Sequence, residues 1–527
     1  MLEEKKKSFI EFCKENTNYI LATFLATIAI YGAWASQYFV SFDAEGLYLE
    51  TSRVTVNPWY MQWIGLGRWA FVVLKKVLGV LSINPFFSIG VFIVLFPMSA
   101  ILWNYLFENW GLKLKNGTRL LFNLLYLSNP IWALQFAYRN QMEVLSIIAA
   151  ILPIAIYYFI YFFEKIYVNK KIWSIDLLNL IISMFTIAFC FAGYQSFVIM
   201  FILSMAIYFF INIMQNQLEL KEFYKKLLIV IILFAITFGI YSVSSDIFRM
   251  LAGVTGTNYS GYLTGQIIWF NTEFSKCFEM VSKGLINIFI GDNIAYTCIL
   301  IIEFLLGIPI IIMQNKKIEN IWLKIWNFII YLSLFIIALI LTILTAGIAA
   351  ARQQFAYALL VAFLGAFEIN YYIENISIIK KVGIIYGTLI VMLSFVVLIQ
   401  SEKNTRLLYS DYFTMKTDYL KMEEIYNRAR EKGAKNGDAI AFVGINHNPF
   451  IEPFVEYEMI GLSYFEITYQ DHEKVIEAMI GYGFEVTKPN LQQRQYAQDR
   501  SHDMGTYPAE DSIVVENGLI VVKLSGN

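Results

Sequence analysis

The sequence predicts a polytopic α-helical membrane protein that ends in a small α/β domain. Of its 527 residues, 58% are hydrophobic and only 15% are charged. The apolar residues gather in runs of about 18 residues or more, which is the length that crosses the hydrocarbon core of a bilayer. The C-terminal part, 401–527, is polar instead. The formal net charge is −1, so no excess of basic residues indicates a nucleic-acid partner.

The apolar runs predict about eleven spans within a transmembrane domain of residues 1–400. The segment 60–82 is also apolar, but Arg68, Lys75 and Lys76 interrupt it. We therefore expect this segment to lie along the membrane interface as an amphipathic helix. The expected spans are 19–40, 85–107, 118–137, 142–163, 175–192, 195–214, 226–243, 293–314, 325–346, 353–373 and 382–400.

Lysine-rich loops predict which ends of the spans face the cytoplasm. The positive-inside rule places Lys and Arg in short cytoplasmic loops. With the N-terminus inside, next to Lys5, Lys6 and Lys7, every lysine-rich loop between the expected spans also lies inside. The loop and helix at 41–82 and the domain 401–527 then face outward. Because the composition is also typical of an AT-rich bacterial genome, we expect a multi-pass protein of a bacterial cytoplasmic membrane, with an extracytoplasmic C-terminal domain.

The C-terminal domain is predicted to mix helix and strand. Residues 411–435 are rich in Lys, Glu and Arg and favour a helix, whereas 438–445 is an apolar run typical of a buried strand. Two β-rich runs in 512–524 flank Asn517 and Gly518, a pair that is typical of a tight hairpin turn. We expect no catalytic residue in this domain.

Two carboxylates lie where the first span ends. Asp43 and Glu45 follow the span directly, and aromatic residues come next in the chain. A carboxylate in a partly desolvated pocket has a raised pKa and can act as a general base. We therefore predict a base among these two acids; the alternative is that both are solvated loop carboxylates. The aromatic residues are Tyr48, Trp59, Tyr60 and Trp63.

Arginines recur at the outer ends of the expected segments, where the positive-inside rule disfavours them. Arg68, Arg139 and Arg352 are predicted to bind a phosphate that is anchored in the membrane, because a guanidinium pairs well with phosphate oxygens. The alternative is that an interfacial arginine extends its head to lipid headgroups. Further candidates for substrate binding, which helix-end packing would also explain, are Trp69, Glu143, Tyr194, Gln195 and Gln353. Glu143 is expected to orient one of the arginines.

No histidine or cysteine spacing indicates a metal site. A divalent cation on Asp43 and Glu45 is chemically possible, but a phosphate leaving group and nearby arginines would reduce the need for it. The loop 244–292 is expected to form either a mobile lid or a structured outer cap.

Several motifs together carry a family resemblance, in the same order along nearly the whole chain. The chain resembles the GT-C class of membrane glycosyltransferases and, more closely, the bacterial O-antigen glucosyl transferases of Gtr type II. The motifs are FDAEGLYL (42–49), WIGLGRW (63–69), FAYRNQMEVLS (136–146), FAGYQSF (191–197), AARQQF (350–355) and SIVVENGLIVVKL (512–524).

The resemblance implies a membrane glycosyltransferase that moves glucose, or a similar hexose, from undecaprenyl phosphate to a cell-envelope glycan such as O-antigen or teichoic acid. A cytoplasmic synthase and a flippase would supply the donor. The acidic residue of the family maps to Asp43, and whether Glu45 is its partner stays open. We expect direct displacement with inversion, with Arg68 on the phosphate and Arg139 or Arg352 as further choices. A lipid-linked-sugar flippase and a polysaccharide polymerase are the alternative functions.

Overall fold

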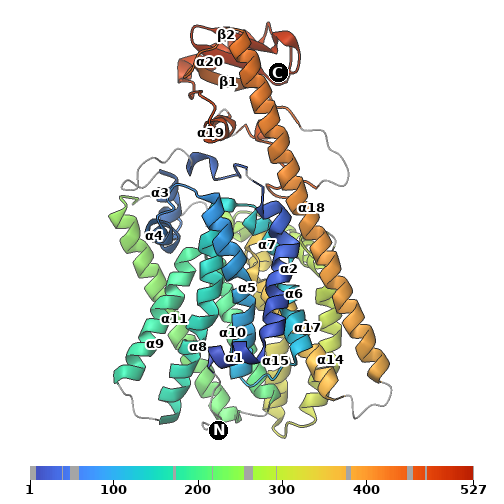
Figure 1. Ribbon diagram of the computed structural model, residues 1–527. Coiled ribbons are helices and arrows are strands. Elements are labelled where there is room, and N and C mark those ends of the chain that lie inside the picture. Colours follow the sequence, from blue (N-terminus) through green and yellow to red (C-terminus); the bar gives the residue numbers. More distant parts are fainter. Residues whose placement is uncertain are drawn as a thin grey trace.

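The computed structural model is a bundle of long helices with a small sheet domain at one end (Figure 1). Helix α1 (Phe9–Glu15) lies at the opposite end of the bundle. We call the end that carries η1 (Glu45–Leu47), α3 (Pro58–Gly65) and α4 (Trp69–Leu78) the cap face. The described residues are 8–37, 39–47, 58–169, 174–215, 218–254, 265–291, 293–375, 382–447, 455–468 and 472–525.

Within these residues, eight helices are long and apolar enough to cross a membrane. This confirms a multi-pass architecture. Their mean hydropathy is high because aliphatic and aromatic residues cover nearly the whole helix surface, as a span in lipid requires. The helices are α2 (Thr17–Ala35), α5 (Pro85–Asn109), α8 (Met142–Asn169), α9 (Ser174–Gly193), α10 (Ser196–Met214), α11 (Leu220–Leu251), α15 (Ile321–Ala338) and α17 (Phe355–Glu374).

The expected continuous span 118–137 is wrong. The chain forms two helices there, α6 (Asn116–Leu127) and α7 (Pro130–Phe136). The Asn129 side chain caps α7 by accepting a hydrogen bond from the backbone N–H of Ile131. Pro130 then occupies the first position of α7, where its missing N–H leaves no hydrogen bond unmade. The same proline prevents α6 from continuing into α7 as one helix.

Two further expected spans are shorter than predicted. Helix α14 (Ile299–Asn315) has 17 residues and begins six positions after the expected start at 293. The expected span 325–346 is divided between α15 and the short α16 (Ile340–Leu344). Part of the loop 244–292 is helical: α11 continues to Leu251, and the segment ends with η3 (Ile268–Phe270) and α13 (Phe274–Ile290). Residues 255–264 lie outside the described part of the chain.

The apolar segment 60–82 does not cross the bundle, as predicted. It forms α3 and α4, of 8 and 10 residues, which correspond to roughly 12 and 15 Å of helix against a hydrocarbon core of about 30 Å. The single helix that we expected is broken at Gly67, whose φ of +80° is a conformation that glycine adopts at no steric cost. Both helices lie on the cap face (Figure 1).

Helix α18 (Val382–Glu431) links the bundle to the C-terminal domain without a break. It is 50 residues long, so the expected last span and the expected helix 411–435 belong to one rod (Figure 1). A helix of this length spans about 75 Å, which exceeds the bilayer core, and its end carries the sheet beyond the cap face (Figure 1).

The C-terminal domain contains a three-stranded sheet of order β1-β3-β2. The central β3 (Leu519–Lys523) pairs in parallel with β1 (Ala439–Val443) and antiparallel with β2 (Ile513–Glu516). The predicted strand and hairpin are thereby confirmed, with Asn517 and Gly518 at positive φ in the turn. Among its described residues the domain also has η6 (Tyr464–Glu466), α19 (Glu473–Gly481), α20 (Leu491–Ser501) and η7 (Glu510–Ser512).

Candidate active site

The two predicted acids lie in a tight turn on the cap face, just after α2. Asp43 has a φ of +61°, in the left-handed region that few residues other than Gly, Asn and Asp adopt. Its carbonyl accepts a hydrogen bond of 2.9 Å from the Asn140 side chain. Glu45 then begins η1. This turn aims both carboxylates at the C-terminal domain.

A lysine of the C-terminal domain bridges the two acids. Lys474 Nζ lies 2.9 Å from Asp43 Oδ1 and 2.7 Å from Glu45 Oε1. The Glu45 side chain is fully buried, whereas 40% of the Asp43 side chain is exposed. Tyr464 completes the surroundings of Glu45 by donating a hydrogen bond of 3.3 Å to Oε2. The two acids are therefore in different environments, one enclosed and one open.

Burial and charge act against each other on these groups. Burial raises the pKa of Glu45 to about 7, because the charge of Lys474 only partly opposes the loss of water and the neighbouring Asp43 adds to the shift. Burial alone would lower the pKa of Lys474, but the two carboxylates outweigh it and the net shift is upward. Lys474 is therefore a permanent cation between the acids.

The structure brings three predicted residues together, Arg68, Tyr194 and Gln195. Arg68 Nε donates a hydrogen bond of 2.9 Å to Gln195 Oε1, and the guanidinium lies 4.3 Å from the ring centroid of Tyr194. Gln195 in turn donates to the carbonyl of Leu66 at 2.6 Å, so the loop before α4 is tied to the start of α10. Within the described part of the chain, the two Nη groups of Arg68 make no hydrogen bond.

Arg139, in η2 (Arg139–Gln141), is 4% exposed and lies beneath the acid turn. Its guanidinium donates to the carbonyls of Gln37 and, at 2.9 Å, of Trp34. It also lies 3.8 Å from the ring centroid of Phe39. These contacts make Arg139 an anchor for the end of α2; its binding of a donor phosphate stays a prediction.

Arg352 lies in η4 (Ala351–Gln353) and forms an ion pair with Glu458 of the C-terminal domain. Its guanidinium lies 4.9 Å from the ring centroid of Tyr138. Burial raises the pKa of Tyr138, with the positive charge of Arg352 opposing this shift and the negative charge of Asp43 adding to it. Tyr138 is thus within electrostatic range of both charges.

Three of the remaining candidates have other surroundings. The expectation that Glu143 orients an arginine is wrong, because its buried carboxylate forms an ion pair with Lys75 of α4. Trp69 stacks on Phe248 of α11 with ring centroids 4.3 Å apart. Gln353 is half-buried in η4.

Two of the four aromatic residues predicted around the acids lie among the residues whose side chains the structure describes. Tyr60 and Trp63 are buried in α3, with ring centroids 5.3 Å apart. Tyr48 and the side chain of Trp59 lie outside the described residues.

Sequence reasoning missed four residues of this site: Lys474, Glu458, Tyr464 and Tyr138. Three of them belong to the C-terminal domain, where nothing in the sequence separates them from the other charged and aromatic residues. Tyr138 could have been found, because it directly precedes Arg139 in a motif that we had selected. No group of three or more His, Cys, Asp or Glu side chains in the described ranges is arranged to hold a metal ion.

Comparison with known proteins places the bundle in a family. The family model described as Glucosyl transferase GtrII matches residues 17–369. This range includes every site residue predicted from the sequence and ends before Lys474, Glu458 and Tyr464. No curated protein and no solved structure gives a significant match. Because the family model covers about two thirds of the chain, this protein belongs to the GtrII family of glucosyl transferases.

Proposed function

We propose that the protein transfers glucose, or a similar hexose, from undecaprenyl phosphate to a cell-envelope polysaccharide such as O-antigen or teichoic acid, with inversion at the anomeric carbon. Glucosyl transfer follows from the family; donor, acceptor and stereochemistry are the proposal. The observation that carries it is that the cap face holds both a carboxylate that is 40% exposed, Asp43, and a guanidinium, Arg68, that Gln195 and Tyr194 fix in place.

Asp43 is the base in this mechanism. A general base must reach the hydroxyl that it deprotonates, and the Asp43 side chain is 40% exposed whereas Glu45 is enclosed. The acceptor oxygen attacks C1 of the sugar as its proton passes to the Asp43 carboxylate. The bond between C1 and the phosphate oxygen breaks, and polyprenyl phosphate leaves. A single displacement of this kind inverts C1 and needs no covalent sugar–enzyme intermediate.

Arg68 is the preferred partner of the departing phosphate. Its Nε is held by Gln195 and its face by Tyr194, so both Nη groups are fixed in direction before the lipid arrives. Preorganised donors that meet charge as it develops are worth roughly 10²–10³ in rate. Since phosphate is a good leaving group and a lysine ammonium already lies between Asp43 and Glu45, the proposed reaction uses no metal ion.

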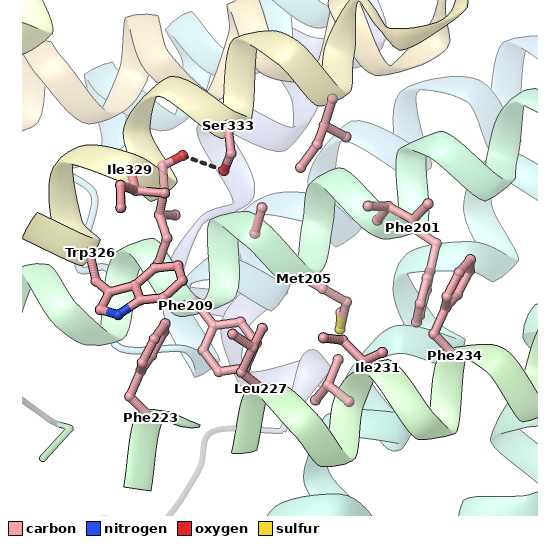
Figure 2. Close-up of a pocket in the computed structure, with 15 residues that line it drawn as sticks. Phe201, Met205, Phe209, Phe223, Leu227, Ile231, Phe234, Trp326, Ile329 and Ser333 are labelled. Carbon is pink, nitrogen blue, oxygen red and sulfur yellow. Dashed lines mark hydrogen bonds between the residues drawn. The ribbon is translucent and has the colours of Figure 1, made fainter. Parts of the chain in front are cut away.

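An apolar path below Arg68 supports a lipid-linked donor. Gln195 donates a hydrogen bond of 3.4 Å to the Tyr241 hydroxyl. From Tyr241 a row of rings continues through Phe238 and Phe234 to Phe201, with successive centroids 5.6, 6.1 and 5.9 Å apart. Phe201 and Phe234 open onto an apolar cavity of about 280 Å³ between α10, α11 and α15 (Figure 2). An isoprenoid chain suits such a path, because it has no polar group to satisfy.

The orientation proposed for this chemistry follows the lysine pattern. The N-terminus is cytoplasmic, and the cap face and C-terminal domain are extracytoplasmic. No nucleotide is available there, so the donor is made by a cytoplasmic synthase and delivered by a flippase. Glycan, lipid donor and bilayer are then the partners of the protein.

A lipid-linked-sugar flippase is the second candidate, favoured by the break between α6 and α7. Transporters place interrupted helices at their binding sites. Asn129, at the break, is fully buried. A flippase does not need a base at Asp43. The variant Asp43→Asn therefore separates the two functions.

The test is the composition of the envelope glycan, measured by mass spectrometry. The strains compared are a deletion strain and the same strain carrying the wild-type gene or Asp43→Asn. We expect a hexose branch that is lost on deletion, returns with the wild type and stays missing with Asp43→Asn at equal protein abundance. Full restoration by Asp43→Asn would reject Asp43 as base. A glycan that is unchanged by deletion would reject the proposed acceptor class.

A further inference from the structure

The C-terminal domain meets the bundle through charged contacts of complementary sign at the candidate site. It contributes Lys474 to Asp43 and Glu45, and Glu458 to Arg352. Figure 1 shows α19, which carries Lys474, between the sheet and the cap face. All of these tail residues lie beyond the range that matches the family model, so the family does not assign them a role.

Several contacts fix the position of Lys474 over the acids. Asp418, on α18, accepts hydrogen bonds of 2.7 Å from the Ser463 hydroxyl and from the backbone N–H of Tyr464. The Tyr464 ring packs against Phe42, with centroids 4.5 Å apart, and its hydroxyl reaches Glu45. These contacts hold η6 between α18 and the acid turn.

A second contact holds α19 itself. The hydroxyl of Tyr482, next to the end of α19, accepts a hydrogen bond of 2.9 Å from the backbone N–H of Val40. This ties the far end of α19 to the segment that precedes Asp43. The lysine near the start of α19 is 13% exposed, so its ammonium has little access to water and depends on the two carboxylates.

Two carboxylates this close would repel each other if both were ionised, and one would take up a proton. The ammonium between them offsets part of that repulsion. Lys474 also binds only Oδ1 of Asp43; the structure gives Oδ2 no hydrogen bond from any residue that it describes. The Asp43 carboxylate is therefore held through Oδ1, and 40% of the side chain is exposed.

We propose that Lys474 is a positioning residue of the active site, which holds the Asp43 carboxylate in register for the acceptor hydroxyl through their 2.9 Å contact, so that the C-terminal domain completes the catalytic centre of the bundle. This inference rests on the proposed role of Asp43 as base. Glu45 is then the buried counterpart that keeps Lys474 in place. The acceptor must enter between α19 and the acid turn, on the exposed side of Asp43.

Another lysine of the domain, Lys488, offers a matched control. Lys488 pairs with Glu477 at 2.5 Å and Glu473 at 3.4 Å, both within the C-terminal domain. It belongs to the same domain and loses a similar ion pair on substitution, but it does not contact the acid turn. Lys488→Met therefore reports what the loss of a lysine does to the domain alone.

The experiment measures transfer of radiolabelled glucose from synthetic undecaprenyl-phosphate glucose to endogenous glycan in membrane vesicles of the deletion strain. The vesicles carry the full-length wild type, Lys474→Met, Lys474→Arg, Lys488→Met or Asp43→Asn. We expect Lys474→Met to lower kcat by about tenfold to hundredfold while the KM for the lipid donor stays within about twofold, because the base is displaced and the contacts of Arg68 are unchanged. Lys474→Arg should restore most of the rate, and Lys488→Met should stay within about twofold of the wild type.

The outcomes separate the two claims. A wild-type rate for Lys474→Met, together with an inactive Asp43→Asn, would overturn the role of Lys474 and leave the proposed function intact. An active Asp43→Asn would overturn the proposed function itself. If Lys474→Met does not accumulate in the membrane, Lys474→Arg decides: a loss of transfer in that charge-conserving variant at wild-type abundance would contradict the inference.

Discussion

Lys474 Nζ and Asp43 Oδ1 lie 2.9 Å apart although 431 positions separate the two residues in the chain. The contact joins the first turn of α19 to the turn that follows α2, and Glu45 shares it. The C-terminal domain, which follows the long helix α18, thus places the positive charge of Lys474 next to the acid turn of the bundle. The charged contacts of the acid turn therefore come from both parts of the chain.

The free energy of unfolding should fall with pH because of Glu45. Its pKa rises from the ordinary value of 4.5 to about 7 in the folded protein, so between these values the folded state holds a proton that the unfolded state has lost. Stability from this group is present below about pH 4.5 and is lost as pH rises through 7, by about 3 kcal/mol in total.

The measurement is the melting temperature of the detergent-solubilised protein between pH 4.5 and 8. Glu45→Gln cannot titrate, so it should gain stability relative to the wild type across this window. Parallel curves for the two proteins would show that Glu45 is not the group responsible.

Arg68→Lys should reduce transfer without destabilising the fold. A lysine keeps the charge, but it loses the hydrogen bond from Nε to Gln195 and the planar contact with Tyr194. We expect a rate lower by roughly 10²-fold and a melting temperature close to that of the wild type. Arg406→Lys, on the partly exposed surface of α18, serves as the control. Equal rates for Arg68→Lys and the wild type would remove Arg68 from the phosphate site.

Arg139→Lys should instead lower stability and activity together. Arg139 supports the end of α2 through the carbonyls of Trp34 and Gln37 and through the Phe39 ring. Hydrogen bonds that involve a charged group contribute about 1.5–3 kcal/mol each, so the melting temperature should drop. A variant that is stable and has lost only its affinity for the lipid donor would point to a direct phosphate contact instead.

The buried ion pair of Lys75 and Glu143 gives a test by double-mutant cycle. Both side chains are 0% exposed, and removal of one partner of such a pair costs about 3–5 kcal/mol, because the other charge is left buried. Lys75→Met and Glu143→Gln should each destabilise the protein more than the two changes combined. Additive losses in melting temperature would show that the pair is not coupled.

Much of the architecture could be predicted, because apolar runs and turn residues report on local physics. The interfacial segment was recognised from Arg68, Lys75 and Lys76, and the hairpin from Asn517 and Gly518. The break at Pro130 was missed because the apolar composition continues across it. The continuous α18 was missed because the change from apolar to polar residues suggested a domain boundary, whereas one helix continues through it.

Several individual residues of the site could be predicted, but most of the contacts that join them could not. Asp43, Arg68 and Gln195 were selected because acids, arginines and amides at span ends need a reason to be there, and the structure does bring Arg68 and Gln195 together. The partners of Asp43 and Glu143 depend on contacts between distant parts of the chain. Periodicity and composition carry no information on such contacts, so Lys474 and Lys75 could be found only in three dimensions.

The most direct test of the account is the transfer rate of Asp43→Asn. Radiolabelled undecaprenyl-phosphate glucose is supplied to vesicles that carry the full-length wild type, Asp43→Asn or the control Asp503→Asn, which changes an exposed acid of the C-terminal domain. The account predicts that Asp43→Asn loses transfer by about 10³-fold or more, because base catalysis contributes about 10²–10⁴-fold, while Asp503→Asn keeps it. Transfer by Asp43→Asn at the wild-type rate would contradict the account.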